Sequence, residues 1–475
     1  MSRVPRIVVR VGLGLAVLLA LGLLAVVALL DPAAHKARIE QTASRVLGME
    51  VHVNGPMSLR WRPQPHLVLR DVHARKHGAD IVVAQEAVIG FEALSLFGRA
   101  WRVRSVALHD GVFAMVRERD GRFNFLKDPE PGPRPERAGP DISFERATIS
   151  YTDPRFDKGI EGHACRGSIR GVHLAGGDQR LLTRLSFEGE ATCADVRAGD
   201  VVLTEVSTTA TGKQGVIDFQ PLTTKWLDAQ SSGHLRADFS GPVPAYQLEQ
   251  TLQQFSVEQL LKALSQKEIA SGRMNLALKL AMQGKALKDL RQSMQGTLSL
   301  RGQGLTYHGV DLDAQFERFE STQNLSLFDV GAMFLAGPAG LLVTKGYDFV
   351  NAAQGAQGKS EIRTLVSDWS VERGVARTRD VAMATAANRV ALKGGIDLVN
   401  DRLQDMTIAL VDAKGCAKVK QQVRGTLQKP QVEKPNPVEA VTGPAVRLIK
   451  KGAELISGDS CEVFYAGAVP GPSPK

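Results

Sequence analysis

Residues 390–410, VALKGGIDLVNDRLQDMTIAL, show most clearly how the body of this protein is built. Apolar side chains recur at every second position in three groups, which are Val390/Leu392, Ile396/Leu398 and Met406/Ile408/Leu410. A period of two is that of a β-strand with one buried face. The breaks at residues 393–395 and at Asn400-Asp401 are typical of tight turns. The stretch therefore predicts antiparallel strands joined by hairpins.

The same alternation recurs on both sides of this stretch. It begins at Leu67 and Leu69, and further short runs are found at 81–84, 88–91, 103–108, 112–116, 142–151, 168–174, 181–188, 201–211, 274–282, 296–301, 304–307 and 310–316. Clusters of Gly, Asp, Asn or Ser separate them, and Arg119-Asp120-Gly121 is the clearest hairpin turn. Residues 127–140 contain five prolines and predict a linker or surface loop. We predict a mainly-β protein.

Four segments favour helices instead. Ile39, Ala43, Val46 and Leu47 share one helical face, and Gly48 is placed to end the helix. Residues 256–259 read as a capping box before a short apolar stripe. Residues 325–343 are very apolar, but Asp329 and the break at residues 337–338 leave a run too short to cross a membrane, so a buried helix is expected. Residues 441–456 predict a last helix.

Residues 11–30, VGLGLAVLLALGLLAVVALL, contain no charge, amide or hydroxyl. As a helix they would span roughly 30 Å, the thickness of a bilayer core. The positions from Val11 through Leu15, Leu18, Leu21, Leu24 and Val27 to Leu30 mark this predicted membrane anchor. Arg3, Arg6 and Arg10 precede it, which predicts a cytoplasmic N-terminus and export of the rest of the chain. A cleaved signal peptide is the alternative, but its apolar region would be shorter and would end in a cleavage site.

Composition excludes some classes of function. The formal charge of +9 is reduced to +6 without the three arginines before the anchor, and the remaining charges of both signs are interspersed. No basic stripe indicates nucleic-acid binding. Outside the cytoplasm the four cysteines could form disulfides, and sequence proximity favours Cys165 with Cys193 and Cys416 with Cys461 over the other pairings, with free buried thiols second.

No motif predicts catalysis. Residues 353–360, AQGAQGKS, fit a relaxed phosphate-binding loop but lack the strand and helix that such a loop needs. Asp311 and Asp313 would share a strand face, with no partner acid, base or metal ligand nearby. His163 and Cys165 have no second pair of ligands at zinc spacing. We expect no catalytic residue, no cofactor and no metal site, and we do not expect an enzyme.

Many strands with one apolar face and few helices pose a packing problem. The sheet must pack on another sheet, close on itself, or curl into a trough that holds something apolar. A pair of β-sandwiches would give the same pattern. For a trough, the candidate lining residues are Leu67, Leu69, Val390, Leu392, Met406, Ile408 and Leu410. Because a membrane anchor is predicted at one end, lipid is the expected ligand of such a trough.

Several stretches over nearly the whole chain form a recognisable series. They are the anchor, VLGMEVHVNGPMSLRW, PHLVLRDVHARK, FAMVRERDGRFNF, the block LQQFSVEQLLKAL to LTYHGVDLD, SVERGVARTRDVAMATAANRVALKGGIDLVNDRLQDMTIAL and SGDSCEVFYAG. In their order and number, the chain resembles the AsmA family of envelope proteins in Gram-negative bacteria. The resemblance is weakest over residues 141–245. The resemblance implies an elongated, twisted antiparallel β-sheet curled into an apolar groove, similar to chorein-type bridge-like lipid-transfer proteins. About 20–28 strands would fit this chain.

The resemblance also implies five regions and a location. These are residues 1–30 (cytoplasmic tip and anchor), 31–130 (chorein-like helix and start of the groove), 131–245 (middle β region), 246–430 (AsmA-like groove module) and 431–475 (C-terminal helix and tail). The expected place is the bacterial inner membrane, with the bulk of the chain in the periplasm. The expected function is to bind and conduct phospholipid acyl chains in support of outer-membrane lipid homeostasis, alone as a shuttle or with a periplasmic or outer-membrane partner. An assembly factor for outer-membrane proteins and a structural scaffold are the alternatives.

Overall fold

The structure is a computed structural model that describes residues 35–62, 64–92, 102–118, 123–125, 136–154, 159–176, 181–199, 201–263, 270–309, 311–322, 358–426, 429–433 and 463–471. The predicted anchor, the turn at 119–121, the helices at 325–343 and 441–456 and most of the proline-rich loop lie outside these residues. Among the described residues, 22 strands and a few short helices form two compact units. Unit 1 comprises residues 1–202 and 210–214, and unit 2 comprises residues 203–209 and 215–475. The mainly-β prediction is confirmed.

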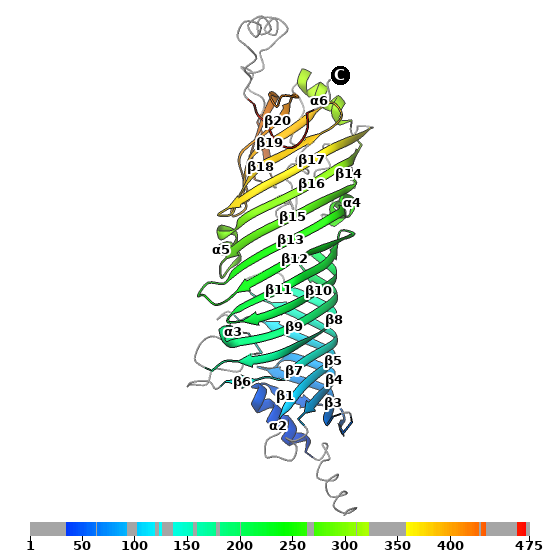
Figure 1. Cartoon of the computed structure of the whole chain (residues 1–475), viewed down its shortest axis with the longest axis vertical. Helices are drawn as coiled ribbons and strands as arrows, with labels where there is room; N and C mark the ends of the chain where they lie inside the picture. The colour runs from blue at the N-terminus through cyan, green and yellow to red at the C-terminus, as the bar shows by residue number, and fades with distance from the viewer. Residues whose placement is uncertain are drawn as a thin grey trace, which may run out of the picture. The chain divides into compact units, whose positions relative to one another are not determined.

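Unit 1 is a twisted sheet with one helix at its N-terminal end (Figure 1). Its elements are α2 (Lys36–Leu47), β1 (Glu50–Val53), β2 (Met57–Arg60), β3 (His66–Lys76), β4 (Ala79–Phe91), β5 (Val103–Val116), β6 (Arg137–Ala138), β7 (Asp141–Thr152), β8 (Ile160–Leu174), α3 (Leu181–Arg184) and β9 (Leu185–Ala198). The neighbouring strands β3, β4 and β5 pair antiparallel, as do β7, β8 and β9. Strands β5 and β7 pair in parallel, because the chain crosses over between them.

Unit 2 is an antiparallel meander. Its elements are β11 (Val216–Trp226), β12 (Ala229–Asp238), β13 (Ala245–Ser256), α4 (Val257–Ala263), β14 (Ala270–Ser271), β15 (Arg273–Gln283), α5 (Leu287–Ser293), β16 (Gln295–His308), α6 (Leu312–Thr322), β17 (Lys359–Glu372), β18 (Val375–Ala384), β19 (Arg389–Asp397), β20 (Arg402–Val411), β21 (Ala417–Gly425) and β22 (Pro430–Val432). Strand β10 (Val201–Lys213) contributes residues to both units. Each strand from β15 to β21 pairs with the next by short connections or after a helix.

Helix α2 confirms the prediction for residues 39–47. It ends where Gly48 takes a left-handed backbone conformation, with its N–H donating to the Ser44 carbonyl. The side chain of Ile39 packs against the small core of unit 1, which consists of Val53, Leu67, Leu69, Ala87 and Phe91. None of the residues of α2 is fully buried, so the helix covers that core with one stripe and leaves its other face in solvent.

Helix α4 begins where the capping pattern predicts. The backbone N–H of Gln259 donates to the Ser256 hydroxyl over 3.1 Å. The acid that completes the cap is Glu258, whose carboxylate accepts hydrogen bonds from the Ser256 hydroxyl and from the Gly272 N–H. The helix buries Val257, Leu260 and Leu261 against the core of unit 2.

Ser256→Ala is therefore expected to destabilise unit 2 by about 1 kcal/mol, because the first turn of α4 loses its cap. Urea unfolding followed by circular dichroism measures this loss. Ser256→Thr is the matched control, since its hydroxyl can both accept the Gln259 N–H and donate to the Glu258 carboxylate, and it should keep most of the stability. Equal stability of Ser256→Ala and the natural protein would show that the cap contributes nothing.

The strand predicted at 310–316 is wrong, because this segment begins helix α6. Asp311 caps the helix by accepting the Ala314 N–H over 3.0 Å. Asp313 accepts hydrogen bonds from the Thr385 hydroxyl and the Asn388 side-chain amide, which ties α6 to the β18–β19 turn. The two carboxylates thus have structural partners. Their spacing also suits a helix, where Leu312 and Phe316 fall on one buried face.

The C-terminal segment 463–471 covers the face of β18–β20 that is opposite to the main core. Phe464, Tyr465 and Val469 pack on small side chains of that face, which include Ala382, Ala391 and Ala409. Several hydrogen bonds hold the segment, among them one from Nη1 of the buried Arg389 to the Val469 carbonyl over 2.9 Å and one from the Tyr465 hydroxyl to Asp380 over 2.6 Å. Burial and the nearby Asp380 carboxylate raise the pKa of Tyr465, so its hydroxyl stays protonated.

Candidate functional site

Unit 1 presents apolar side chains in rows that cross several strands on one face. Residues that are paired in register point to the same side of a sheet. One row runs Leu67–Ile89–Val106–Ile142–Ile169 and the next runs Leu69–Ala87–Leu108–Phe144. A third contains Val82, Phe113 and Ile149. The sequence patterns of five separate strands therefore combine into one continuous apolar face.

The rows stay in line because the alternation of neighbouring strands shifts at matching places. Asp110 in β5 and Arg146 in β7 both have positive φ, which non-glycine residues rarely adopt. Beyond Asp110 the apolar positions change from even to odd numbers, from Leu108 to Phe113. Arg146 forms a bidentate ion pair with Asp110, with two N···O distances of 2.6 Å. The hydrogen bonds and charge of the guanidinium lower the pKa of Asp110, so the pair is ionised at neutral pH.

The opposite face of the same strands is charged. Cross-strand pairs join His163 to Asp195 over 2.9 Å and Arg70 to Glu86 over 3.5 Å. Arg170 lies 3.5 Å from Glu190. All these pairs are partly exposed, so each contributes little to stability. They make this face the more polar one, although it also carries Val68, Val88 and Val112, so the rows are the more apolar side of unit 1.

A disulfide lies next to the rows. Cys165 and Cys193 are bonded, the pairing that sequence proximity favours. Cys165 is fully buried, and its register partner is Ala147. A Cβ at Gly162 would stand 2.9 Å from the Cys165 sulfur, so a glycine is needed where the disulfide crosses the sheet. The disulfide fixes β8, the last strand of the rows, to β9.

The rows differ in burial along the sheet. Leu67 and Leu69, two of the candidate lining residues, are buried in the core beneath α2. Past them, Val106, Phe113, Ile142, Phe144 and Ile149 are only half-buried. Among the described residues of unit 1, no helix packs over β5 and β7. This half-buried part of the face is the candidate functional site, and we call it the open face. Its residues are Val106, Leu108, Phe113, Met115, Ile142, Phe144, Ile149, Tyr151 and Ile169.

In unit 2 the corresponding apolar rows are closed. Val390 pairs with Leu410, and Leu392 pairs with Ile408, so these candidate residues do share one face with Met406. All five are buried in a core that also contains Trp369 and Phe255. The Trp369 indole N–H donates to the buried Ser367 hydroxyl over 2.8 Å. In this structure the five residues therefore contact protein rather than an open groove.

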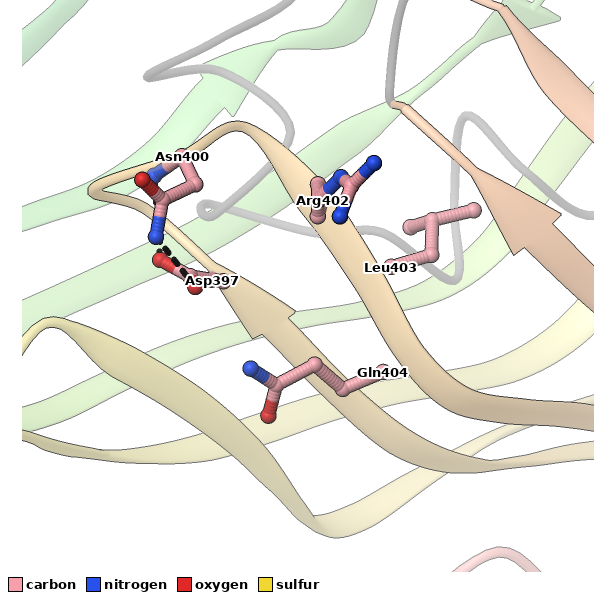
Figure 2. Close-up of a pocket in the computed structure, with 5 residues that line it drawn as sticks. All are labelled: Asp397, Asn400, Arg402, Leu403 and Gln404. Carbon is pink, nitrogen blue, oxygen red and sulfur yellow. Dashed lines mark hydrogen bonds between the residues drawn. The ribbon is translucent and has the colours of Figure 1, made fainter.

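A pocket at the β19–β20 turn is lined by Asp397, Asn400, Arg402, Leu403 and Gln404 (Figure 2). The one carboxylate of this pocket, Asp397, already has hydrogen-bond donors within the turn. It accepts the backbone N–H groups of Val399 and Asn400 over 2.9 and 3.0 Å, and the Asn400 side-chain amide over 2.8 Å. Burial opposes ionisation, but these hydrogen bonds outweigh it and lower the pKa of Asp397. The pocket is explained by the hairpin that the sequence predicted at Asn400.

The other predicted site residues are placed as follows. Cys416 is disulfide-bonded, and its predicted disulfide partner, Cys461, lies outside the described residues. The anchor positions and Arg3, Arg6 and Arg10 also lie outside them. Within the described part of the chain, no helix is both long and apolar enough to span a membrane. In the same part, no three His, Cys, Asp or Glu side chains converge as metal ligands would.

Sequence reasoning missed the open face as a site, although it identified the strands that form it. Both faces of β5 carry apolar side chains, since Val112 is exposed while Phe113 lies in the rows. Alternation therefore could not say which face is apolar throughout. The useful signal is the set of interruptions His109-Asp110-Gly111 and Glu145-Arg146-Ala147, which mark where the alternation of two neighbouring strands shifts.

The comparison with protein families gives one match. Residues 188–381 match the AsmA family, which confirms the resemblance over this part of the chain. The matched span runs from β9 to β18 and so includes most of the meander of unit 2. No significant match was found among curated proteins or among solved structures.

Proposed function

Taking the AsmA-family match as the premise, we propose that this protein is a non-enzymatic, inner-membrane-anchored periplasmic protein that binds phospholipid acyl chains and passes them along its apolar β-face. In this proposal residues 11–30 are the anchor, and phospholipid homeostasis of the outer membrane is the purpose. The observation that carries the proposal is the open face of unit 1. It offers half-buried apolar side chains in continuous rows, backed by a charged face that keeps the sheet in water.

The chemistry of the open face suits an acyl chain. Burying a methylene group is worth about 0.8 kcal/mol, so a tail that lies along one row is held by many small, equal contacts. Such contacts have no fixed register, which would let the tail slide from row to row. The disulfide and the Asp110–Arg146 pair hold the strands in place while the side chains of the face remain free to accommodate a guest.

The proposal assigns the acyl site to unit 1. The lining candidates of unit 2 are already buried by protein, so they offer no surface to a tail in this structure. Passage through unit 2 would require its apolar rows to separate from what covers them. Binding in unit 1 and transfer beyond it are therefore two separable steps.

Site-specific photo-crosslinking tests the binding step. We expect benzoyl-phenylalanine at position 113 of the full chain, expressed in cells and irradiated, to capture phospholipid that mass spectrometry detects on the protein. The matched control is the same residue at position 112, which is 46% exposed and lies on the opposite face. Equal capture at both positions would contradict the proposal, since exposure alone would then explain the crosslinks.

A further inference from the structure

One end of the sheet of unit 1 carries arginines around exposed apolar side chains. Trp61 is 50% exposed and lies between Arg60 and Arg62, just after β2. Val103 is 42% exposed and lies between Arg102 and Arg104, at the start of β5. We call these six residues the Trp61 patch. A tryptophan flanked by cations is a combination typical of the boundary between a membrane and water.

Backbone and side-chain contacts bring the two halves of the patch together. Phe91 donates its N–H to the Pro65 carbonyl over 3.0 Å, which joins the end of β4 to the loop after Trp61. Glu92 donates its N–H to the Arg102 carbonyl over 3.1 Å. The Arg104 guanidinium donates to the Gln64 side chain over 3.4 Å. The patch is therefore one surface, although its halves are about forty residues apart in the sequence.

The charge of this surface is strongly positive. Among the described residues at this end, the four arginines lie near two carboxylates: Glu92, 3.9 Å from Arg102 with both side chains well exposed, and Asp141, which is in register with Ser105 beside Arg104. Arginine binds phosphate by paired hydrogen bonds, and tryptophan favours the boundary between hydrocarbon and water. This combination matches an anionic phospholipid surface, which supplies phosphates and an apolar layer at the depth of a side chain.

The direction of α2 places the N-terminal side of the chain at the same end. Val51 donates its N–H to the Ser44 hydroxyl over 2.9 Å, and Val53 donates to the Glu40 carboxylate over 2.7 Å. Later residues of β1 therefore contact earlier residues of α2, so the helix runs antiparallel to β1. Its first turn points toward the His66 end of β3, where β2 ends at Arg60 and the Trp61 patch lies. The apolar segment 11–30 precedes this turn by a few residues.

We propose that the Trp61 patch docks on the anionic phospholipid surface of the membrane that holds the N-terminal segment. The inference rests on the proposed anchor for proximity, and it adds an orientation. Val106 and Ile142 form the row nearest to the patch, since Val106 follows Val103 by three residues in β5. Docking sets this end of the open face against the bilayer, where a tail can leave the lipid layer without crossing water.

An environment-sensitive probe tests the docking. The full chain with Val103→Cys, labelled with nitrobenzoxadiazole, is reconstituted into vesicles of phosphatidylcholine and phosphatidylglycerol. We expect a blue shift of the probe and quenching by spin-labelled lipid. Val201→Cys is the matched control, because Val201 is also 42% exposed but lies at the other end of the strands of unit 1, and its probe should stay in water. The described cysteines are all disulfide-bonded and do not compete for the label.

Charge variants test whether the arginines of the patch contribute to docking. Arg60→Gln and Arg62→Gln should each lower the ratio of docked to undocked protein about fivefold, and vesicles of phosphatidylcholine alone should do the same to a larger extent. The inference is overturned if the Val103 probe stays in water on anionic vesicles, or if it shifts only when another protein is present. Lipid capture at position 113 in the same preparation would then leave the proposed function standing, so the two failures are distinguishable.

Discussion

Phe144→Glu is expected to abolish most of the lipid capture in unit 1 without unfolding it. Phe144 lies in the middle of the open face, in register with Leu108 and Gly167. A carboxylate at this position stays hydrated and interrupts the row, so a tail would lose contacts for three or four methylenes. This loss is about 2–3 kcal/mol, or roughly a 30- to 150-fold fall in affinity. The measurement is the yield of phospholipid crosslinked at position 113.

Ser143→Glu is the matched control for this prediction. Ser143 is also half-buried, is paired with Ala107 and Ser168, and lies on the charged face of the same strand. Its carboxylate should leave capture unchanged. Resistance of the Cys165–Cys193 disulfide to mild reduction reports whether each variant keeps the fold of unit 1. Full capture by a folded Phe144→Glu variant would show that the tail does not lie on this face.

The strands could be predicted from the sequence because each carries its own signal. Val390, Leu392, Ile408 and Leu410 alternate with residues of the other face, and the structure pairs them as a hairpin. The burial of each row could not be predicted, because apolar and polar residues alternate in the same way whether or not another element packs over the row. Whether a second layer covers a row depends on segments far away in the sequence. Thus Leu67 lies beneath α2, while Ile142, three strands away in the same row, is only half-buried.

Segments of mixed character were the main source of error. Residues 310–316 alternate well enough for a strand, yet Leu312 and Phe316 are also spaced for a helix. A helix forms because Asp311 caps it and because Asp313 accepts hydrogen bonds from the β18–β19 turn, about seventy residues later in the sequence. The two aspartates are evident in the sequence, but the contact between Asp313 and this distant turn could not be predicted from it. Tertiary contacts therefore decided between two local patterns of similar strength.

A charged side chain should destabilise the protein most on the buried face of unit 2, which carries the groove candidates from Val390 to Leu410. Ile408 is fully buried, and its register partners are Leu392 and Gln421. An unpaired carboxylate there must be dehydrated or protonated, and the lost side chain leaves a void. Ile408→Asp is therefore expected to destabilise unit 2 by more than about 4 kcal/mol. The measurement is urea unfolding followed by tryptophan emission, to which the buried Trp369 contributes.

Thr407→Asp separates a closed core from a conduit at this position. Thr407 lies on the opposite face of β20, is half-buried and is paired with Lys393, so the new carboxylate has both water and a cation and should change stability by less than about 0.5 kcal/mol. If Ile408→Asp unfolds unit 2 and Thr407→Asp does not, the buried rows are a structural core that a tail does not enter. If instead Ile408→Asp folds as stably as Thr407→Asp, the rows must open readily to water. They would then be a second stretch of the lipid path, and the acyl site could no longer be confined to unit 1.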